Sequence, residues 1–172
     1  MKLQIKGLMK GVNMNIRLFT DGACSNNPGP GGYGCLVLMH ESIIKVSGYE
    51  ENTTNNRMEL KAVIKGIEKV LNVIYQENYD VEKLEVISDS SYVVNAFNKN
   101  WFKKWKTNGF KTVEGKEIKN IDLWLELDKF LNEIEFLKIN LVFTKIKGHA
   151  GDYFNETVDE LAKSEIVKNR RN

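Results

Sequence analysis

Three segments with the character of β-strands follow one another near the start of the sequence, and only short links separate them. In residues 16–21 the side chains alternate as they do in a half-buried strand. Residues 33–39 and 43–50 are the second and third segments, and a glycine-rich turn at 27–32 joins the first segment to the second. Parallel strands need a crossover of roughly a dozen residues or more. The short links therefore predict an antiparallel meander of three strands.

A long amphipathic helix is predicted directly after the meander, over residues 56–75. Its apolar residues, among them Leu60, Val63, Ile64 and Ile67, recur at helical spacing. Helices and strands alternate along the rest of the chain, which is the pattern of an α/β fold with a mixed sheet. The further elements that the sequence predicts are strands at 83–88 and 139–145, helices at 91–98, 101–106, 122–136 and 155–168, and a polar loop at 107–119.

The composition is that of one soluble globular domain. The chain has 172 residues, of which 42% are hydrophobic and 28% are charged, and these proportions exclude a disordered chain. No apolar run approaches the length of a membrane helix, so we expect neither a membrane span nor a membrane partner. We expect one domain over 15–168, a short extension at 1–14 and a tail at 169–172.

The N-terminal segment and the cysteines bear on the location of the protein. Residues 1–17 carry four basic side chains and no acid, but they lack the long apolar core of a secretory signal. A transit peptide is the weaker alternative because the segment has no serine. We expect a flexible extension, with Met9 and Met14 as alternative starts. Cys24 and Cys35 form neither a disulfide framework nor a metal-type pair, which fits a reducing, cytoplasmic setting.

Gly29, Gly31 and Gly34 match the spacing G-x-G-x-x-G of a dinucleotide-binding turn. That turn requires a helix directly after it, so that the pyrophosphate lies at the helix N-terminus. Residues 35–39 have strand character instead, and Pro30 stiffens the loop. A tight turn between two antiparallel strands is the better interpretation.

Four acidic residues stand out because of where they lie in the predicted elements. Asp21 ends the first strand, Asp89 ends the fourth, Glu59 lies in the first turn of the long helix, and Asp159 lies in the last helix. Each has a structural alternative: Asp21 as a turn residue, Glu59 in a capping box with Asn56, Asp89 as an N-cap and Asp159 as an exposed helix acid. The residues alone leave these alternatives open.

If the fold brings these four carboxylates together, they require cations. Two like charges about 4 Å apart repel by roughly 4 kcal/mol at an effective dielectric of about 20. A site without cations would therefore be strained or would take up protons. Hard divalent ions that prefer oxygen ligands, chiefly Mg²⁺, relieve the repulsion. The sequence has no Cys/His cluster, which argues against zinc.

The same acids lie within a series of motifs that point to one known family. The motifs are TDGACSNNPGPGGYG at 20–34, TTNNRMEL at 53–60, SDSSYV at 88–93, WFKKWKTNGFK at 101–111, IDLW at 121–124, KGHAG at 147–151 and NETVDELA at 155–162. In order and spacing they resemble the type 1 ribonuclease H family, over about residues 15–168.

The resemblance implies a ribonuclease H-like fold, in which helices flank a five-stranded mixed sheet whose first three strands are antiparallel. It implies an endonuclease that hydrolyses the RNA strand of RNA–DNA hybrids, leaves 5′-phosphate and 3′-hydroxyl ends, and removes RNA primers and R-loops. Two Mg²⁺ ions per active site are implied, with Mn²⁺ as a substitute: one activates the attacking water and the other stabilises the departing 3′ oxygen. The implied metal ligands are Asp21, Glu59, Asp89 and Asp159.

Two further residues acquire roles through the resemblance. His149 lies in a glycine-bounded loop, where a lone histidine is usually only exposed to solvent. It matches the family's mobile histidine, which assists proton transfer or product release. Asn155 lies four residues before Asp159, hence on the same helix face, and is expected beside the metals as a support or a substrate contact.

Recognition of a hybrid depends on the 2′-hydroxyl, which marks the RNA strand. The resemblance assigns these contacts to the glycine turn and the active-site helix. A pocket for a phosphate of the DNA strand is implied at Thr54 and Asn55, because small polar groups at a helix N-terminus suit an anion. The residues implied in the contacts to the RNA strand are Gly22, Cys24, Asn27, Asn55 and Glu59.

Residues 99–119 contain seven lysines and two glutamates, a net charge of +5 in a chain whose total is +2. Taken alone, such a stretch is typical of a solvated surface whose aromatic side chains pack inward. It matches the family's basic protrusion, which grips the DNA strand, so binding is expected to weaken with salt. The implied contacts are Trp101, Lys103, Lys104, Trp105, Lys106 and Lys111.

Ser91 stands where the family often has glutamine, which weakens one expected RNA contact without touching the metal ligands. Three rival functions compete with this interpretation: a hybrid-binding protein without catalysis, an integrase or transposase of the wider superfamily, and the nuclease domain of a reverse transcriptase. The four acids with His149 argue against the first, and the long hybrid-gripping segment argues against the second. Nothing in the sequence indicates a polymerase. We expect a stand-alone monomeric enzyme without an obligate protein partner.

Overall fold

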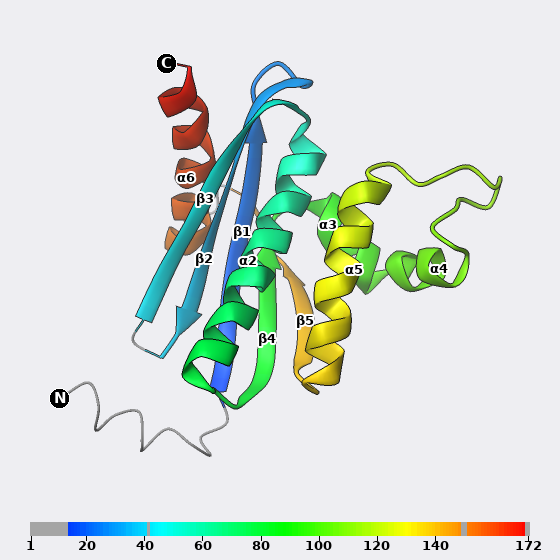
Figure 1. Cartoon of the computed structure of the whole chain (residues 1–172). Helices are drawn as coiled ribbons and strands as arrows, with labels where there is room; N and C mark the ends of the chain where they lie inside the picture. Colours follow the sequence, from blue (N-terminus) through cyan, green and yellow to red (C-terminus); the bar gives the residue numbers. More distant parts are fainter. Residues whose placement is uncertain (1–13, 41, 149–150, 171–172) are drawn as a thin grey trace.

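The computed structural model describes residues 14–40, 42–148 and 151–170, which form a five-stranded sheet with helices on both faces (Figure 1). The strand order is β3-β2-β1-β4-β5, so β1 lies at the centre of the sheet. The elements in chain order are β1 (Met14–Cys24), β2 (Gly29–Met39), β3 (Ser42–Thr53), α2 (Asn55–Glu77), β4 (Val81–Ser88), α3 (Ser91–Asn98), α4 (Trp101–Thr107), α5 (Ile121–Phe136), β5 (Asn140–Lys145) and α6 (Tyr153–Asn169).

The antiparallel meander predicted for the start of the chain is confirmed. β1 pairs with β2 in antiparallel register, with Leu18 opposite Val37. β2 pairs with β3 in the same way, with Val37 opposite Ile44. β4 then pairs with β1 in parallel, and β5 pairs with β4 in parallel. The sheet is therefore mixed, as expected for the α/β class that the sequence predicts.

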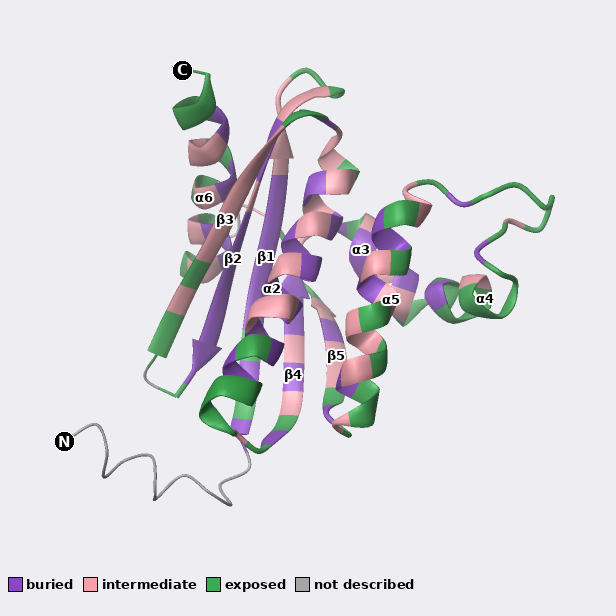
Figure 2. Ribbon diagram, in the orientation of Figure 1, coloured by how far each residue is buried: buried purple, intermediate pink, exposed green. Residues whose placement is uncertain are grey.

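Successive side chains of a strand point to opposite faces of the sheet, and the central strand uses both faces. Ile16 and Leu18 face the main core, which α2 covers together with α5. Phe19 points to the opposite face, where it packs in a smaller cluster with Val158 of α6. Figure 2 shows the central part of β1 buried, and the continuous buried stretch runs from Leu18 to Gly22. A residue near the end of β1 therefore lies between two covered faces, close to helices on both.

Helix α2 packs on the sheet through a continuous apolar side, on which Leu60, Ile64 and Ile67 are fully buried. Its N-cap is Thr54, whose hydroxyl accepts a hydrogen bond from the backbone N–H of Arg57 at 3.4 Å. The helix therefore begins one residue earlier than the sequence predicts. The capping box proposed as an alternative for residue 56 is wrong, because the cap lies two residues before it.

The predicted turn at 27–32 is wrong from Gly29 onward. Only residues 25–28 connect the first two strands, and Gly29 already belongs to β2. The physical reason is packing against α6, because a Cβ on Gly32 would overlap the backbone oxygen of Ala162. The glycines are therefore strand residues that let a helix backbone lie directly on the sheet. No helix follows them, so the structure also excludes the dinucleotide-binding turn.

Substitution of Gly32 by alanine tests this close packing. We expect Gly32→Ala to lower the free energy of unfolding by about 1–3 kcal/mol, because α6 must move away from the sheet. The control is Gly48→Ala, whose Cβ would meet only the side chain of Tyr33, a group that can move. Urea unfolding of both variants measures the difference, and equal losses would contradict the role assigned to Gly32.

α4 and the loop that follows it project away from the sheet, at the right of Figure 1. The loop is attached to the fold by Phe110 and Ile118, which are both buried, and by a bridge between Lys111 and Glu117. The lysine-rich stretch is thus an ordered projection with its own apolar anchors. Within the described residues, the helices are all too short or too polar to cross a membrane.

Candidate active site

The four acids singled out in the sequence come from four different elements. Asp21 lies in β1, Glu59 lies near the start of α2, Asp89 directly follows β4, and Asp159 lies in α6. The fold brings them into one region: Gly22, next to Asp21, lies against the backbone of Glu59, and Asn155, one turn before Asp159, donates to Asp89. The parallel pairing of β1 with β4 brings the first and third acids to neighbouring strands.

Asp21 is buried, with 8% of its surface exposed. Burial is the largest cause that raises its pKa, from 3.8 to about 7, and the charges of Asp89, Asp159 and Glu59 add to the rise. The backbone N–H of Gly22 donates to Asp21 Oδ1 at 2.7 Å, and this hydrogen bond lowers the pKa in part. A carboxyl group with this pKa is partly protonated near neutral pH. It therefore needs a cation beside it to stay ionised.

Glu59 is held by two side-chain donors. Asn55 Nδ2 donates to its Oε1 at 2.8 Å, and Ser90 Oγ donates to its Oε2 at 2.5 Å. Burial raises the pKa of Glu59, the hydrogen bond from Ser90 lowers it, and the charge of Asp89 raises it again. Glu59 therefore does not serve as a helix cap. Its carboxylate is oriented toward the other acids.

Asp89 is not an N-cap either, because Ser90 caps α3 and accepts from the backbone N–H of Val93 at 3.2 Å. Asp89 Oδ2 instead accepts from Asn155 Nδ2 at 3.4 Å. A Cβ on Gly148 would lie 2.6 Å from the same oxygen. The backbone that leads toward the 149–150 segment therefore passes directly beside the third acid.

α6 begins two residues earlier than predicted, because Asp152 caps it and accepts from the backbone N–H of Asn155 at 2.9 Å. Asn155 is 3% exposed, and its Oδ1 has no hydrogen-bond partner among the described residues. Asp159 lies one turn further, where Lys163 Nζ contacts its Oδ2 at 2.6 Å. Asn155 therefore lies beside Asp89, and its expected role as a support or a substrate contact stays a prediction.

The donor set fits hard divalent cations. The four acids offer only carboxylate oxygens, and the unpartnered Oδ1 of buried Asn155 adds another oxygen beside them. In the part of the chain that the structure describes, no three His, Cys, Asp or Glu side chains converge as a finished metal cage. Glu59 and Asp159 are engaged with protein donors instead. An ionised carboxylate offers about four lone-pair sites, so these contacts leave both groups able to bind a cation as well.

His149 lies outside the described residues, so its expected role stays a prediction. The residues expected to contact the RNA strand gather where the β1–β2 link meets the start of α2. The backbone N–H of Asn55 donates to Asn27 Oδ1 at 3.1 Å, and the thiol of Cys24 points to the backbone oxygen of Thr53 at 3.3 Å. Their contact with a substrate also stays a prediction.

Gly22 explains why the link and the helix can be so close. A Cβ on Gly22 would overlap the backbone nitrogen of Glu59, so only glycine lets the strand run past the start of α2. Thr54, expected in a phosphate pocket, uses its hydroxyl as the cap of α2. The N-terminus of α2, where we expect an anion to bind, lies beside the acids because Gly22, next to Asp21, packs against the backbone of Glu59.

Ser91, the departure from the family pattern, has an unexpected partner. Its hydroxyl contacts Lys145 Nζ at the end of β5. Because Lys145 pairs in register with Ser88 of β4, this ammonium group lies at the same edge of the sheet as Asp89. A positive charge thus stands near the position that the family often gives to a neutral amide.

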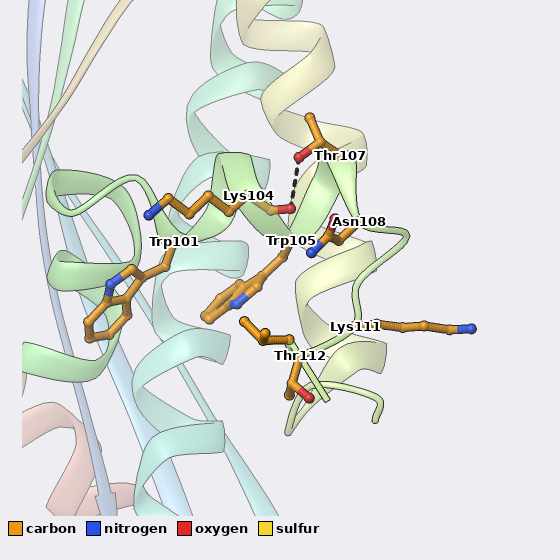
Figure 3. Close-up of a pocket in the computed structure, with 8 residues that line it drawn as sticks. Trp101, Lys104, Trp105, Thr107, Asn108, Lys111 and Thr112 are labelled. Carbon is orange, nitrogen blue, oxygen red and sulfur yellow. Dashed lines mark hydrogen bonds between the residues drawn. The ribbon is translucent and has the colours of Figure 1, made fainter. Parts of the chain in front are cut away.

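The basic segment forms a pocket at its outer side. Trp101 and Trp105 come within 6.4 Å of each other, measured between ring centroids, and Lys106 is turned away to Asp128 at 2.8 Å. Lys106 is thus paired with α5 in this structure, and its expected contact with the DNA strand stays a prediction. Figure 3 shows the pocket, of about 330 Å³, and its lining residues are Trp101, Lys104, Trp105, Thr107, Asn108, Lys111, Thr112 and Val113.

Two polar residues at the site were not predicted. Lys163 could have been found, because it follows Asp159 by four residues and such pairs meet on a helix. Ser90 could not have been found in this way, because its bond to Glu59 joins residues 31 positions apart. That contact depends on α2 packing against α3, whose N-cap is Ser90.

Known proteins agree with this arrangement. A family model described as RNase H matches residues 13–167. The chain is 50% identical over 157 residues to the ribonuclease H of Caldicellulosiruptor saccharolyticus, which covers 90% of this chain and 98% of that relative. The chain belongs to the RNase H family. The ribonuclease H of Acetivibrio thermocellus, 43% identical over 91% of this chain and 97% of its own length, supports the same enzyme class. The expected class, a ribonuclease H, is thus confirmed.

Solved structures of RNase H proteins have the same fold. LC9-RNase H1 superimposes with a TM-score of 0.72 at 26% identity, over 91% of this chain and 74% of that one. LC11-RNase H1, solved in complex with an RNA/DNA hybrid, has a TM-score of 0.67 at 24% identity, over 90% of this chain and 99% of that one. The RNase H-like fold expected from the sequence is therefore confirmed. Enzymes of the family generally use divalent metal ions.

Proposed function

We propose that this chain hydrolyses the RNA strand of RNA–DNA hybrids with two divalent metal ions, Mg²⁺ or in its place Mn²⁺, and leaves 5′-phosphate and 3′-hydroxyl ends. The metal ligands are Asp21, Glu59, Asp89 and Asp159. The observation that carries this proposal is the packing of the acids around one point. Gly22, next to Asp21, lies against the backbone of Glu59, and Asn155, one turn before Asp159, donates to Asp89 while its buried Oδ1 has no partner among the described residues. The raised pKa of Asp21, about 7, agrees with this crowding of carboxyl groups. Four carboxylates this close repel one another when they are ionised, and bound divalent cations relieve that repulsion.

Bound divalent ions would supply an activated water and neutralise charge on the phosphate and on the departing 3′ oxygen. The protein's own groups hold the acids in place for that chemistry. Gly22 donates its N–H to Asp21, Asn55 and Ser90 orient Glu59, and Asn155 donates to Asp89. His149, in the segment after Gly148, takes the role of moving a proton or releasing product.

Substrate recognition is proposed on both sides of the acids. Gly22, Cys24, Asn27 and Asn55 contact the RNA strand where the β1–β2 link meets α2, and Ser91 contributes beside them. Thr54 and Asn55 hold a phosphate of the DNA strand. The basic segment, with its pocket, binds the DNA strand away from the acids. Its proposed contacts are Trp101, Lys103, Lys104, Trp105, Lys106 and Lys111. LC11-RNase H1 was solved with an RNA/DNA hybrid, which supports this substrate class. We also propose that the protein acts in the cytoplasm as a monomer.

The test is cleavage of one labelled RNA strand in three settings: alone, in an RNA–RNA duplex and in an RNA–DNA hybrid, each with Mg²⁺ or with chelator. We expect cutting only in the hybrid and only with the metal. Tight hybrid binding without cutting, under Mg²⁺ and under Mn²⁺, would instead support a binding protein that has lost catalysis. Cutting of free RNA would contradict the proposed specificity.

The proposed grip on the DNA strand predicts a change in salt dependence. We expect the double substitution of Lys104 and Lys111 by glutamine to weaken hybrid binding. We also expect it to reduce the slope of log affinity against log salt by roughly 0.7–0.9 for each phosphate that the variant no longer neutralises. Fluorescence anisotropy at several salt concentrations, in chelator, measures both quantities. The control is Lys45→Gln, on β3 at the opposite edge of the sheet. An unchanged slope in the double variant would remove these lysines from the interface.

A further inference from the structure

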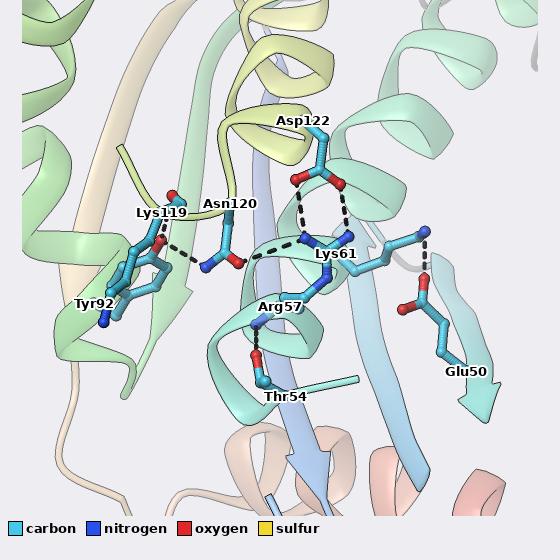
Figure 4. Close-up of polar contacts among 8 residues, drawn as sticks. All are labelled: Glu50, Thr54, Arg57, Lys61, Tyr92, Lys119, Asn120 and Asp122. Atoms are coloured by element: carbon cyan, nitrogen blue, oxygen red, sulfur yellow. Dashed lines mark hydrogen bonds and ion pairs between the residues drawn. The ribbon is translucent and has the colours of Figure 1, made fainter. Parts of the chain in front are cut away.

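Arg57 lies two residues before Glu59 on α2, and its side chain reaches across to α5 (Figure 4). Its guanidinium makes two parallel bonds to Asp122, NH1 to Oδ1 at 2.9 Å and NH2 to Oδ2 at 2.6 Å. This hydrogen bonding raises the pKa of Arg57 and lowers the pKa of Asp122. The paired geometry fixes the direction of α5 relative to the start of α2 as well as the distance.

Asn120 connects the same arginine to a third element. It occupies the N-cap position of α5 in the left-handed region, with φ of 59°, and its side chain makes no capping bond. Its Oδ1 instead accepts from Arg57 NH1 at 3.5 Å, and its Nδ2 donates to the hydroxyl of Tyr92 at 3.0 Å. A side-chain cap ordinarily stabilises the start of a helix. The amide gives up that stabilisation and bridges α2 to α3.

Tyr92 is the second residue of α3 and lies three positions after Asp89. Its hydroxyl accepts from Asn120 Nδ2 and from Trp124 Nε1, each at 3.0 Å, and donates to the backbone oxygen of Lys119 at 3.4 Å. A tyrosine hydroxyl has one proton and two lone pairs. All of its hydrogen-bonding capacity is therefore used to join α3, α5 and the end of the basic loop.

Trp124 carries the connection into the basic segment. Its side chain is fully buried, and its ring lies 5.2 Å from the ring of Trp105 in an edge-to-face contact and 5.8 Å from the ring of Phe102. Trp105 in turn contacts Trp101. A continuous set of hydrogen bonds and ring contacts thus runs from the helix of Glu59 to the pocket of α4.

We infer that these residues, which we call the α2–α5 junction, position the basic segment relative to the cleavage site. The junction consists of Arg57, Tyr92, Asn120, Asp122 and Trp124. It holds the start of α2, which carries Glu59, and the start of α3, which follows Asp89, against the base of α4. A hybrid gripped by α4 is thereby presented to the acids at one fixed distance along its axis. The inference rests on the proposed function.

A positioning role predicts that loss of the junction lowers the rate of cleavage without lowering the affinity for the hybrid. Tyr92 and Asp122 belong neither to the proposed metal site nor to the proposed hybrid contacts, so substitution of either should leave affinity for the hybrid within about twofold. A scissile phosphate displaced by about 1 Å can cost up to about 100-fold in rate. We therefore expect kcat to fall at least 10-fold with little change in KM, and cleavage of a defined hybrid to spread over several phosphates.

Two variants test the junction without removing packing volume. Tyr92→Phe keeps the ring but leaves the donors of Asn120 and Trp124 without their acceptor. Asp122→Asn breaks the charge pair at a side chain that is 59% exposed, where ion pairs contribute little to stability. The matched control is Glu126→Gln, which breaks a 4.0 Å pair with Lys65 between the same two helices further from the acids.

Each variant is assayed for hybrid affinity in chelator, for kcat and KM with Mg²⁺, for the positions of cleavage on one defined hybrid and for thermal stability. The expected result is a lower kcat with spread cleavage for Tyr92→Phe and Asp122→Asn, and wild-type behaviour for Glu126→Gln. Unchanged kcat and cleavage positions in an active background would overturn the inference alone. So would losses that follow the melting temperature equally in all three variants. A wild-type chain that does not cut hybrids would overturn the proposed function, and this inference with it.

Discussion

Asp21→Asn is expected to abolish hydrolysis of the RNA strand while leaving most of the affinity for the hybrid. Asparagine keeps the shape of the side chain and can still accept the N–H of Gly22, which donates to Oδ1 at 2.7 Å in the wild type. It removes a charge on which binding of the proposed divalent ions depends. Loss of several kcal/mol of charge stabilisation, at one factor of ten per about 1.4 kcal/mol, predicts a fall in rate of at least about 1,000-fold.

Binding should survive because the proposed grip on the hybrid lies elsewhere. The lysines of α4 and the polar groups at the start of α2 keep their positions in this variant. The measurements are single-turnover cleavage with Mg²⁺ and anisotropy of a labelled hybrid in chelator. Asp80→Asn, the same chemical change at an exposed position before β4, serves as the control. Full activity of Asp21→Asn would remove Asp21 from the metal site, and a parallel loss of binding would show that the fold had been disturbed.

Local patterns were sufficient to predict most elements of the fold. The period of the apolar residues predicted the meander, and α3 was placed with its observed bounds, Ser91–Asn98. The run of glycines was misread because glycine has no side chain to show a period. The meaning of Gly32 lies in the backbone of α6, some 130 residues further along the chain. Such a contact leaves no local signal.

The sequence could predict which acids form the candidate site, but it could not predict the contacts that orient them. Asp21 was expected to end the first strand, but β1 continues to Cys24, so Asp21 is a strand residue and not a turn residue. Asp89 directly follows β4, the parallel neighbour of β1, so the approach of these two acids follows from the topology once the sheet order is known. The partners that orient Glu59 do not follow from the spacing alone, because Ser90 comes from a different element. The sequence also offered a cap for residue 56 that competed with the correct assignment, and only the observed cap at Thr54 removed it.

The metal-free protein should lose stability as the pH rises toward neutral, and Mg²⁺ should restore it. Burial and the neighbouring acids raise the pKa of Asp21 from 3.8 to about 7, so folding favours its protonated form. The stabilisation is fully present below pH 3.8 and is lost as the pH rises through about 7. Carboxyl groups with lowered pKa, such as Asp122, act in the opposite sense at more acidic pH. The titration of Asp21 is therefore best isolated between about pH 5 and 8, where the metal-free protein should lose about 2–3 kcal/mol of its free energy of unfolding.

The comparison that isolates this effect is the difference between wild type and Asp21→Asn at each pH, because both contain every other titrating group. Without metal, the variant should be more stable than the wild type at pH 8, and the two should approach each other at pH 5. With saturating Mg²⁺ the wild type should gain stability by mass action, while the variant should gain much less. Chelator should reverse the gain. Urea unfolding of both proteins at pH 5 and at pH 8, each with and without Mg²⁺, measures these differences. A wild type whose stability is flat from pH 5 to 8, or a variant that gains as much from Mg²⁺, would mean that Asp21 neither stores this repulsion nor binds the ion that relieves it.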